Sequence, residues 1–313
     1  MNKKSKSYYG PFFWLAAVSF IVPLFVAHAA FRNTHPPTRP AIHLDASGVD
    51  HALWDYLLKK YVENGLIDYD GMEQDYLFRT YLNQLGQAQP AKLKTEAEQL
   101  ALLCNAYNAF VIDGVISHGI RSSVMDYQQD GKEFFDIPEH IFGNLTVSLN
   151  DIEHRMIRER FHEPRIHVAL VCAARSCPVI RREAYIGSRL SAQLEDQAYV
   201  FANNRTYVDF DEQQNQLKLS PILQWYGEDW DVVGGYLPWL VKRIENSDLR
   251  EAVSCAMKSE VDIVFFEYDW SLNSQFDPTA DNSTSSDGTA PSRKANPPQK
   301  QKTDFGSGSI PNG

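Results

Sequence analysis

The pattern of apolar positions alternates between stripes of helical period and short runs of strand length. The strongest helical stripe covers 96–118, where apolar residues recur every three or four positions. Helices are predicted over 50–65, 76–85, 96–118, 151–161, 180–201, 220–230, 237–244 and 248–257, and strands over 134–137, 141–147, 166–171, 206–210, 216–219 and 261–268. This mixture predicts an α+β fold, a helix-rich single domain with a small, mostly antiparallel sheet.

Both ends of the chain differ in composition from its middle. Three lysines, an uncharged apolar run over 12–26 and small residues up to Ala29 are typical of a signal peptide over 1–29. An uncleaved anchor is the alternative, because the uncharged run approaches the length that spans a bilayer. Both readings predict an exported protein, periplasmic or secreted. The sequence further predicts a Pro-rich linker over 30–41, the globular domain over 42–275 and a disordered tail over 276–313. The tail is expected to be dispensable for folding, because it has almost no apolar residues.

The formal net charge of −10 at pH 7 narrows the classes of partner. An acidic chain is a poor match for nucleic acid or for an anionic membrane surface. Neither a phosphate-binding P-loop nor a dinucleotide fingerprint occurs in the sequence, so no cofactor is predicted. The expected partner is a small molecule or a peptide, and no membrane contact is expected once the signal is cleaved.

One short stretch, 165–178, combines a buried run with reactive side chains. Apolar residues on both faces of the predicted strand at 166–171 indicate that it is buried on both sides. The strand delivers Cys172 into a loop of small residues that stops at Pro178, a common way to present a reactive group. Because side chains alternate along a strand, His167 and Cys172 are expected on opposite faces.

A nucleophilic role for Cys172 requires a lowered pKa, supplied by a nearby base or by a helix N-terminus. His154 is the preferred base, and it stands beside Glu153 in the first turn of the helix predicted over 151–161. Arg175 is a candidate for binding a substrate carboxylate. The helix predicted after Pro178 is expected to offer backbone N–H groups to an oxyanion.

Two amides on the longest predicted helix allow two interpretations. Asn105 and Asn108 are three residues apart and lie on one helix face. They either bond a neighbouring backbone, as buried polar groups usually do, or form a polar wall of the site. Trp225 presents a similar choice, because it either lines a groove for a ligand or belongs to the core.

Five motifs follow one another along the chain. They begin at Cys104, Leu149, His167, Leu219 and Tyr268, and they read CNAYNA, LNDIEH, HVALVC followed by SCP, LSPILQWYG and YDWSLN. In this order they resemble the DUF547 family, a domain of unknown function found in exported bacterial proteins and, in divergent form, in plants. The resemblance covers about 67–273 and implies no assigned reaction.

The resemblance also bears on the cysteines. Bacterial members usually have isoleucine at the place of Cys104, which implies that Cys104 is a core residue. Divergent plant members keep a cysteine at the place of Cys172 and have serine at that of Cys177. This implies that Cys172 matters more, and that a disulfide between the two is not a requirement of the family.

Two classes of function remain open on these residues. The first is a cysteine-dependent hydrolase or acyltransferase, with Cys172, His154 and Glu153 as catalytic residues and Asn105, Asn108, Arg175 and Trp225 as binding residues. The second is a non-enzymatic exported binding or scaffold module, in which the cysteines are structural as disulfides or as buried thiols. No metal site is predicted, because no compact ligand spacing occurs in the sequence.

Overall fold

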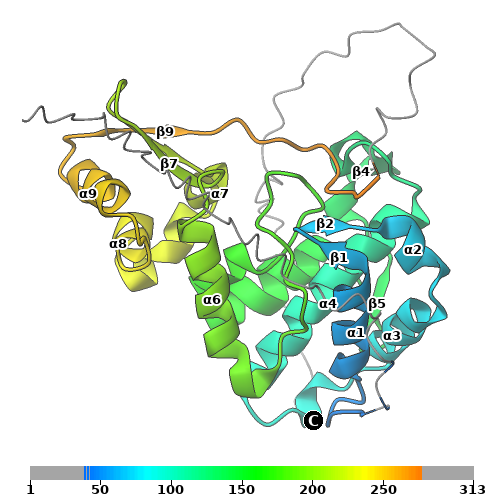
Figure 1. The fold of residues 1–313 in the computed structure, drawn as a ribbon. Helices are drawn as coiled ribbons and strands as arrows, with labels where there is room; N and C mark the ends of the chain where they lie inside the picture. The colour runs from blue at the N-terminus through cyan, green and yellow to red at the C-terminus, as the bar shows by residue number, and fades with distance from the viewer. Residues whose placement is uncertain (1–38, 40, 42, 277–313) are drawn as a thin grey trace, which may run out of the picture. The chain divides into compact units, whose positions relative to one another are not determined.

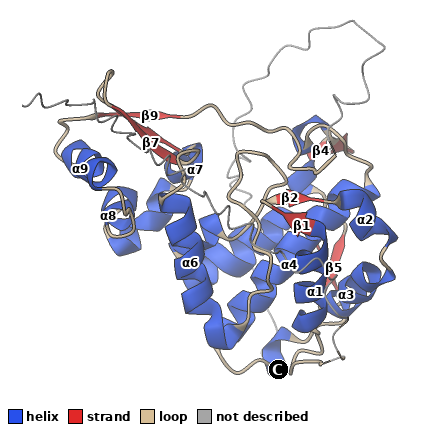
Figure 2. Cartoon of the chain, viewed as in Figure 1, coloured by secondary structure: helices blue, strands red, loops and turns tan. Residues whose placement is uncertain are grey.

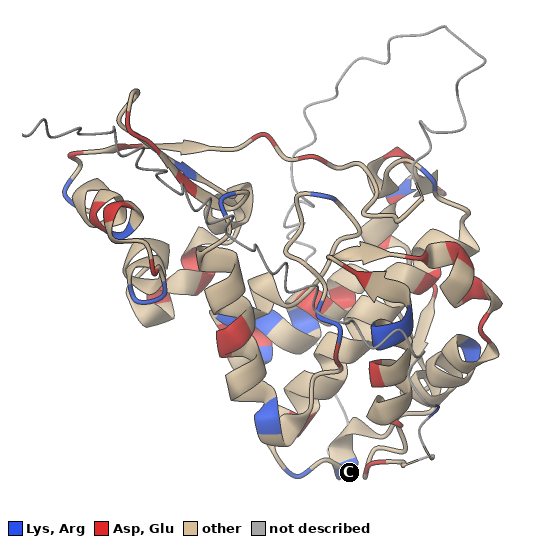
Figure 3. Cartoon of the chain, viewed as in Figure 1, with Lys and Arg blue, Asp and Glu red and all other residues tan. Residues whose placement is uncertain are grey.

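The computed structural model describes residues 39, 41 and 43–276. The predicted signal peptide, most of the predicted linker and the tail from residue 277 lie outside the described residues, so those assignments stay predictions. The described part is a helix-rich α+β fold with small sheets, as the apolar pattern predicts (Figure 1, Figure 2). Acidic and basic residues are interspersed along its helices and loops (Figure 3).

Helices account for most of the regular structure. The α-helices are α1 (His51–Tyr61), α2 (Tyr69–Gln74), α3 (Tyr76–Gly86), α4 (Glu96–Ser117), α5 (Glu159–Phe161), α6 (Leu190–Ala202), α7 (Pro221–Trp225), α8 (Tyr236–Val241) and α9 (Ser247–Ala256). A π-helix, η4 (Asp151–Arg158), precedes α5. The 3₁₀ segments are η1 (Pro90–Lys92), η2 (Val124–Asp126), η3 (Phe134–Asp136), η5 (Pro164–Val168), η6 (Gly187–Arg189) and η7 (Gly227–Val233).

The strands are short and pair mostly antiparallel. Two-stranded hairpins join β1 (Val62–Glu63) to β2 (Leu66–Ile67), β3 (Gln128–Gln129) to β4 (Lys132–Glu133), and β5 (His140–Phe142) to β6 (Leu145–Val147). The remaining sheet has the order β7 (Val208–Asp211), β8 (Gln216–Leu219), β9 (Asp262–Phe265), with β8 antiparallel to β7 and parallel to β9. The predicted strand at 134–137 is wrong, because this segment forms η3.

Helix α4 runs through the larger apolar core. A capping box starts it, in which the Thr95 hydroxyl accepts from the Glu98 N–H and the Glu98 carboxylate accepts from the Thr95 N–H. Its apolar residues are buried on all sides, as expected of a helix surrounded by other elements. Among the described residues it is the one helix long and apolar enough to cross a membrane, but 83% of its apolar window is buried inside the fold, which is typical of a core helix.

Two apolar cores meet at η5. The larger one surrounds α4 and includes Ile166. The smaller one includes residues of β7, β8, α8 and α9, together with Val168. Figure 1 shows α6 between these two groups of elements. Segment 166–168 therefore contributes to both cores, and it leads directly to Cys172.

The chain after β9 returns to the larger core as an extended segment, 266–276, which we call the return segment (Figure 1). The N–H of Ile67 in β2 donates to the Asn273 carbonyl at 2.9 Å, and the Ile67 carbonyl accepts from the Gln275 N–H at 3.0 Å. The Leu272 N–H donates to the Ser122 carbonyl. These bonds fix the last sequence motif, which begins at Tyr268, against the larger core.

The predicted strand at 166–171 is wrong, because η5 (Pro164–Val168) takes its first half. Pro164 stands in the first turn of η5, where its missing N–H is no loss. The Glu163 carboxylate caps the segment by accepting from the Arg165 N–H at 3.1 Å. The backbone therefore turns where the apolar run predicted an extended chain.

The side chain of Asn108 makes the backbone hydrogen bonds that a neighbouring strand would otherwise supply to this segment. Its side chain donates to the Ala169 carbonyl at 3.0 Å and accepts from the Val171 N–H at 3.0 Å. The backbone groups before Cys172 are thus satisfied by one buried amide instead of a sheet. The rule of alternating faces does not apply, and His167 and Cys172 line the same cavity.

The predicted helix over 180–201 is wrong in its first half, because α6 begins only at Leu190. Side-chain amides hold the preceding loop. Asn105 accepts from the Tyr185 N–H at 2.9 Å and donates to its carbonyl at 2.8 Å, and Gln193 bonds backbone groups on either side of Tyr185. No helix N-terminus follows Pro178, so the expected source of oxyanion N–H groups is absent from this part of the described chain.

Candidate active site

The loop after Cys172 is fixed by the return segment. Ala174 and Leu272 form an isolated antiparallel bridge, and the Ser176 N–H donates to the Asp269 carbonyl at 3.1 Å. Ala173 has a φ of +61°, a left-handed conformation that is uncommon for a residue with a Cβ. Such strain persists only where the surroundings impose it, and it gathers at functional sites. Cys172 is therefore held in a defined position.

The thiol of Cys172 has several hydrogen-bonding neighbours. Its Sγ lies 3.0 Å from the Tyr268 hydroxyl, and the Cys172 N–H donates to Cys177 Sγ at 2.9 Å. Burial alone would raise the pKa of Cys172, but hydrogen bonds from Cys177, Tyr268 and the Ala174 N–H outweigh burial and lower that pKa. Burial and the neighbouring Cys172 raise the pKa of Cys177 instead. Both cysteines are free thiols.

Cys172 opens onto a small cavity of about 50 Å³. Side chains from α4, η4, η5, α7 and the return segment line it. Its lining side chains with a thiol, hydroxyl, carboxylate or imidazole group are Tyr107, Glu153, His167, Cys172, Cys177, Tyr226 and Tyr268. The cavity therefore brings together the thiol of Cys172, the carboxylate of Glu153 in η4 and the imidazole of His167 in η5.

His167 is held by Asp229 of η7. The distance from His167 Nε2 to Asp229 Oδ2 is 2.7 Å, and Asp229 also accepts two hydrogen bonds from Arg158, at 2.6 and 2.8 Å. Burial lowers the pKa of His167, so its ring is neutral at neutral pH. A neutral imidazole that donates from Nε2 keeps a basic Nδ1. Burial would raise the pKa of Asp229, but the bonds from His167 and Arg158 hold it well below its usual range.

Glu153 is buried, with 5% of its surface exposed. The Tyr107 hydroxyl donates to Glu153 Oε2 at 2.9 Å, and Tyr226 also forms a hydrogen bond with this carboxylate. Burial raises the pKa of both tyrosines, so both hydroxyls remain protonated and donate. The Tyr226 ring also stacks on His167, with 3.9 Å between the ring centroids. Tyr226 thus connects the carboxylate with the imidazole.

Three aromatic side chains form a wall of the cavity. Trp225, Tyr268 and Trp270 have ring centroids 4.6 to 6.0 Å apart. Trp225 comes from α7, and the other two come from the return segment. The return segment reaches this wall because it pairs with β2, through the bridge between Ile67 and Ser274. The wall therefore combines residues that are far apart in the sequence and forms only in the folded chain.

Residues 90–201 match the family model described as Protein of unknown function, DUF547. This segment matches the DUF547 family. It carries Tyr107, Glu153, His167 and Cys172, whereas Asp229 and the aromatic wall lie beyond the matched residues. No curated protein and no solved structure matches the chain significantly. The family description assigns no reaction.

The structure places some of the predicted site residues on the cavity and others elsewhere. Cys172, Glu153 and Trp225 line it. His154 is not among the lining residues, and its Nδ1 lies 2.9 Å from Arg158 Nη1. Arg158 in turn binds Asp229, the residue that holds His167. His154 is therefore linked to His167 through Arg158 and Asp229. Of the two histidines, His167 lines the cavity together with Cys172, and His154 does not.

The remaining predicted binding residues do not line the cavity. Arg175 is exposed, and its backbone N–H donates to the Ser271 carbonyl at 2.9 Å. Asn105 and Asn108 bond backbone groups, which is the first of their two interpretations. Asn108 still acts on the DUF547 site, because it fixes the two residues that precede Cys172.

Several side chains of the site were not predicted from the sequence. Tyr107, His167 and Tyr268 stand inside the five motifs, so motif membership was the available signal. Asp229 lies outside the motifs and 62 residues from His167, and only the folded chain brings the two together.

The described residues contain no group of three or more histidine, cysteine or acidic side chains able to hold a metal ion.

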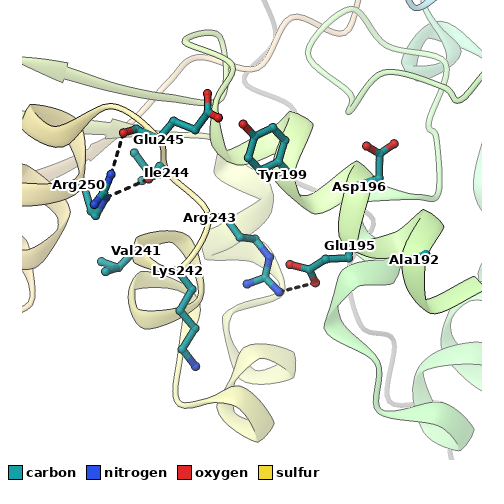
Figure 4. A pocket seen from close by; sticks show the side chains of 10 residues that line it. All are labelled: Ala192, Glu195, Asp196, Tyr199, Val241, Lys242, Arg243, Ile244, Glu245 and Arg250. Carbon is teal, nitrogen blue, oxygen red and sulfur yellow. Dashed lines mark hydrogen bonds and ion pairs between the residues drawn. The ribbon is translucent and has the colours of Figure 1, made fainter.

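A second hollow lies between α6 and the segment 241–250 (Figure 4). Its charged groups are largely engaged within the protein. Arg243 pairs with Glu195 at 2.7 Å, and Arg250 donates to the backbone carbonyls of Ile244 and Glu245. The residues that line this hollow include no cysteine, histidine or serine. Of these two hollows, the Cys172 cavity is the one lined by cysteine and histidine.

Proposed function

We propose that the chain is an exported cysteine-dependent hydrolase or acyltransferase that forms an acyl-enzyme at Cys172. The observation that carries the proposal is the meeting of a half-buried thiol of lowered pKa with the His167–Asp229 pair on one cavity. A nucleophile, a base and a group that orients the base are the three parts that covalent acyl transfer requires. Export rests on the signal-peptide pattern over 1–29.

In the first step, the free Nδ1 of His167 takes the proton of the Cys172 thiol, and Cys172 Sγ attacks the carbonyl carbon of an ester, thioester or amide. The new S–C bond places negative charge on the carbonyl oxygen, and the bond to the leaving group then breaks as His167 supplies a proton to that group. Asp229 keeps the imidazole oriented and stabilises it while it is charged. The product of this step is a thioester on Cys172 and a free alcohol, thiol or amine.

In the second step, water or another acceptor attacks the thioester, and His167 takes up the acceptor's proton. The S–C bond breaks, and the departing Cys172 sulfur regains its proton from His167, which restores the starting state. Tyr268 is suited to stabilise charge in both steps, because its hydroxyl lies 3.0 Å from Sγ and its raised pKa keeps it protonated. Burial is the main cause of that raised pKa.

Trapping of the acyl-enzyme tests the proposal. The full exported chain is mixed with p-nitrophenyl acetate, and intact mass and peptide mapping are followed together with release of nitrophenol. We expect a mass gain of one acetyl group, located on Cys172, with a burst of nitrophenol. Acetylation that is absent, or that spreads over surface lysines and spares Cys172, would contradict the proposal and favour the binding or scaffold module.

A further inference from the structure

The cavity contains a negative charge that no cation in its lining balances. Glu153 is the one acidic residue among the lining residues, and neither lysine nor arginine occurs among them. The hydroxyls of Tyr107 and Tyr226 satisfy its oxygen atoms by hydrogen bonding but bring no positive charge. A buried carboxylate is costly unless it is paired, so its place on a cavity wall needs a reason.

Arg158 interacts electrostatically with Glu153, but it faces two carboxylates, Glu153 and Asp229, so these three groups together keep one excess negative charge. Arg158 is bound by Asp229 through two hydrogen bonds, so those two charges largely cancel. His167 is neutral at neutral pH, because burial lowers its pKa. A group that enters the cavity therefore meets a net negative potential from Glu153, and a Cys172 thiolate adds to it.

The aromatic wall favours the same kind of ligand. The faces of Trp225, Tyr268 and Trp270 carry the negative part of the ring quadrupole, which attracts cations. A carboxylate combined with aromatic rings is a typical arrangement for binding an organic ammonium group. The cavity, at about 50 Å³, has room for a small head group and not for a large ligand.

We infer that this cavity binds a small organic cation, and that the acyl substrate of Cys172 carries an alkylammonium group which lies against Glu153 and the aromatic wall. The substrate part of this inference rests on the proposed function, whereas the cation site does not. Glu153 then acts in substrate binding, and the cysteine chemistry is left to Cys172, His167 and Asp229.

Charge-selective labelling of Cys172 tests the inference. Methanethiosulfonate reagents with 2-aminoethyl, 2-hydroxyethyl and 2-sulfonatoethyl groups differ mainly in charge. Each forms a mixed disulfide with the Cys172 thiolate and releases methanesulfinate. Rates at Cys172 in the full chain are followed by peptide mapping and divided by those of a free small thiol. We expect the aminoethyl reagent to be favoured over the hydroxyethyl one by about tenfold, and the sulfonatoethyl reagent to be the slowest.

The variant Glu153→Gln keeps the size of the side chain and should bring the aminoethyl preference close to that of the free thiol. Glu159→Gln, a change of the same charge at an exposed position, should leave the preference intact. An equal loss of rate with all three reagents in Glu153→Gln would overturn the inference, because Glu153 would then act on the thiol itself.

A second measurement does not depend on thiol reactivity. In Cys172→Ala, ethylammonium should change tryptophan fluorescence in a saturable way and ethanol should not, and the response should vanish when Glu153→Gln is added. A response that is absent, or equal for both compounds, would overturn the cation site. Cation binding without any acylation of Cys172 would leave the cation site standing and overturn the proposed function and the substrate assignment.

Discussion

Cys172→Ser is expected to lower acyl turnover by on the order of 10³-fold or more, because a serine hydroxyl at this place lacks the lowered pKa that makes the thiol nucleophilic. The change is small in volume, so the free energy of unfolding should fall by only about 1 kcal/mol. Steady-state hydrolysis of an activated ester by the full chain, together with a chemical unfolding curve, measures both quantities.

Cys255→Ser is the matched control. Cys255 is partly exposed in α9, and burial raises its pKa, so its removal should leave turnover within about twofold of the wild type. Cys177→Ser should also cost much less activity than Cys172→Ser, although Cys177 supports the loop through its bond with the Cys172 N–H. Turnover that survives in Cys172→Ser would contradict an acyl-enzyme at this residue.

Asp229→Asn is expected to have the second-largest effect. It leaves the nearly buried Arg158 without its carboxylate and His167 without its orienting acceptor. Loss of one partner of a largely buried ion pair typically lowers the free energy of unfolding by about 3–5 kcal/mol, and the 25% exposure of the Asp229 side chain places the expected loss at about 2–3 kcal/mol. Turnover should fall by on the order of 10²-fold or more, because the base is no longer held.

The stability part of this prediction depends on pH. The pKa of Asp229 is lower in the folded chain than in the unfolded chain, so its contribution is fully present above the usual aspartate pKa of about 3.9. The difference between wild type and Asp229→Asn should therefore hold from neutral pH down to about pH 4 and shrink below it. Asp231→Asn, an exposed change in the same η7 segment, should alter neither stability nor turnover. A wild-type advantage that grows as the pH falls would contradict this account.

The class of fold could be predicted from the sequence, because helical stripes and short apolar runs indicate the type of each element and the face that it buries. The apolar stripe over 96–118, for instance, predicts one long helix, and α4 (Glu96–Ser117) is that helix. The apolar run at 166–171 was misread for a physical reason. Its backbone is satisfied by the side chain of Asn108, from a helix that lies about 60 residues earlier, and no local pattern reveals such a bond.

The site was predicted in part. Cys172 and Glu153 stand in motifs whose residue types suggest chemistry, and both line the cavity. The preference for His154 over His167 as the base rested on the alternation of side chains along a strand, and η5 forms where that strand was predicted. Asp229 comes from η7, and its role follows from a contact that only tertiary structure creates.

The pH dependence of Cys172 alkylation tests the central claim most directly. Iodoacetamide labelling of the folded full chain, resolved by peptide mapping, gives the rate at each cysteine between acid and alkaline pH. We predict that Cys172 labels with an inflection below the ordinary thiol value of about 8.5, and that Tyr268→Phe moves this inflection upward, because a donor to the thiolate is lost. Labelling of Cys172 only after unfolding, or with an inflection at or above that of Cys255, would contradict the account.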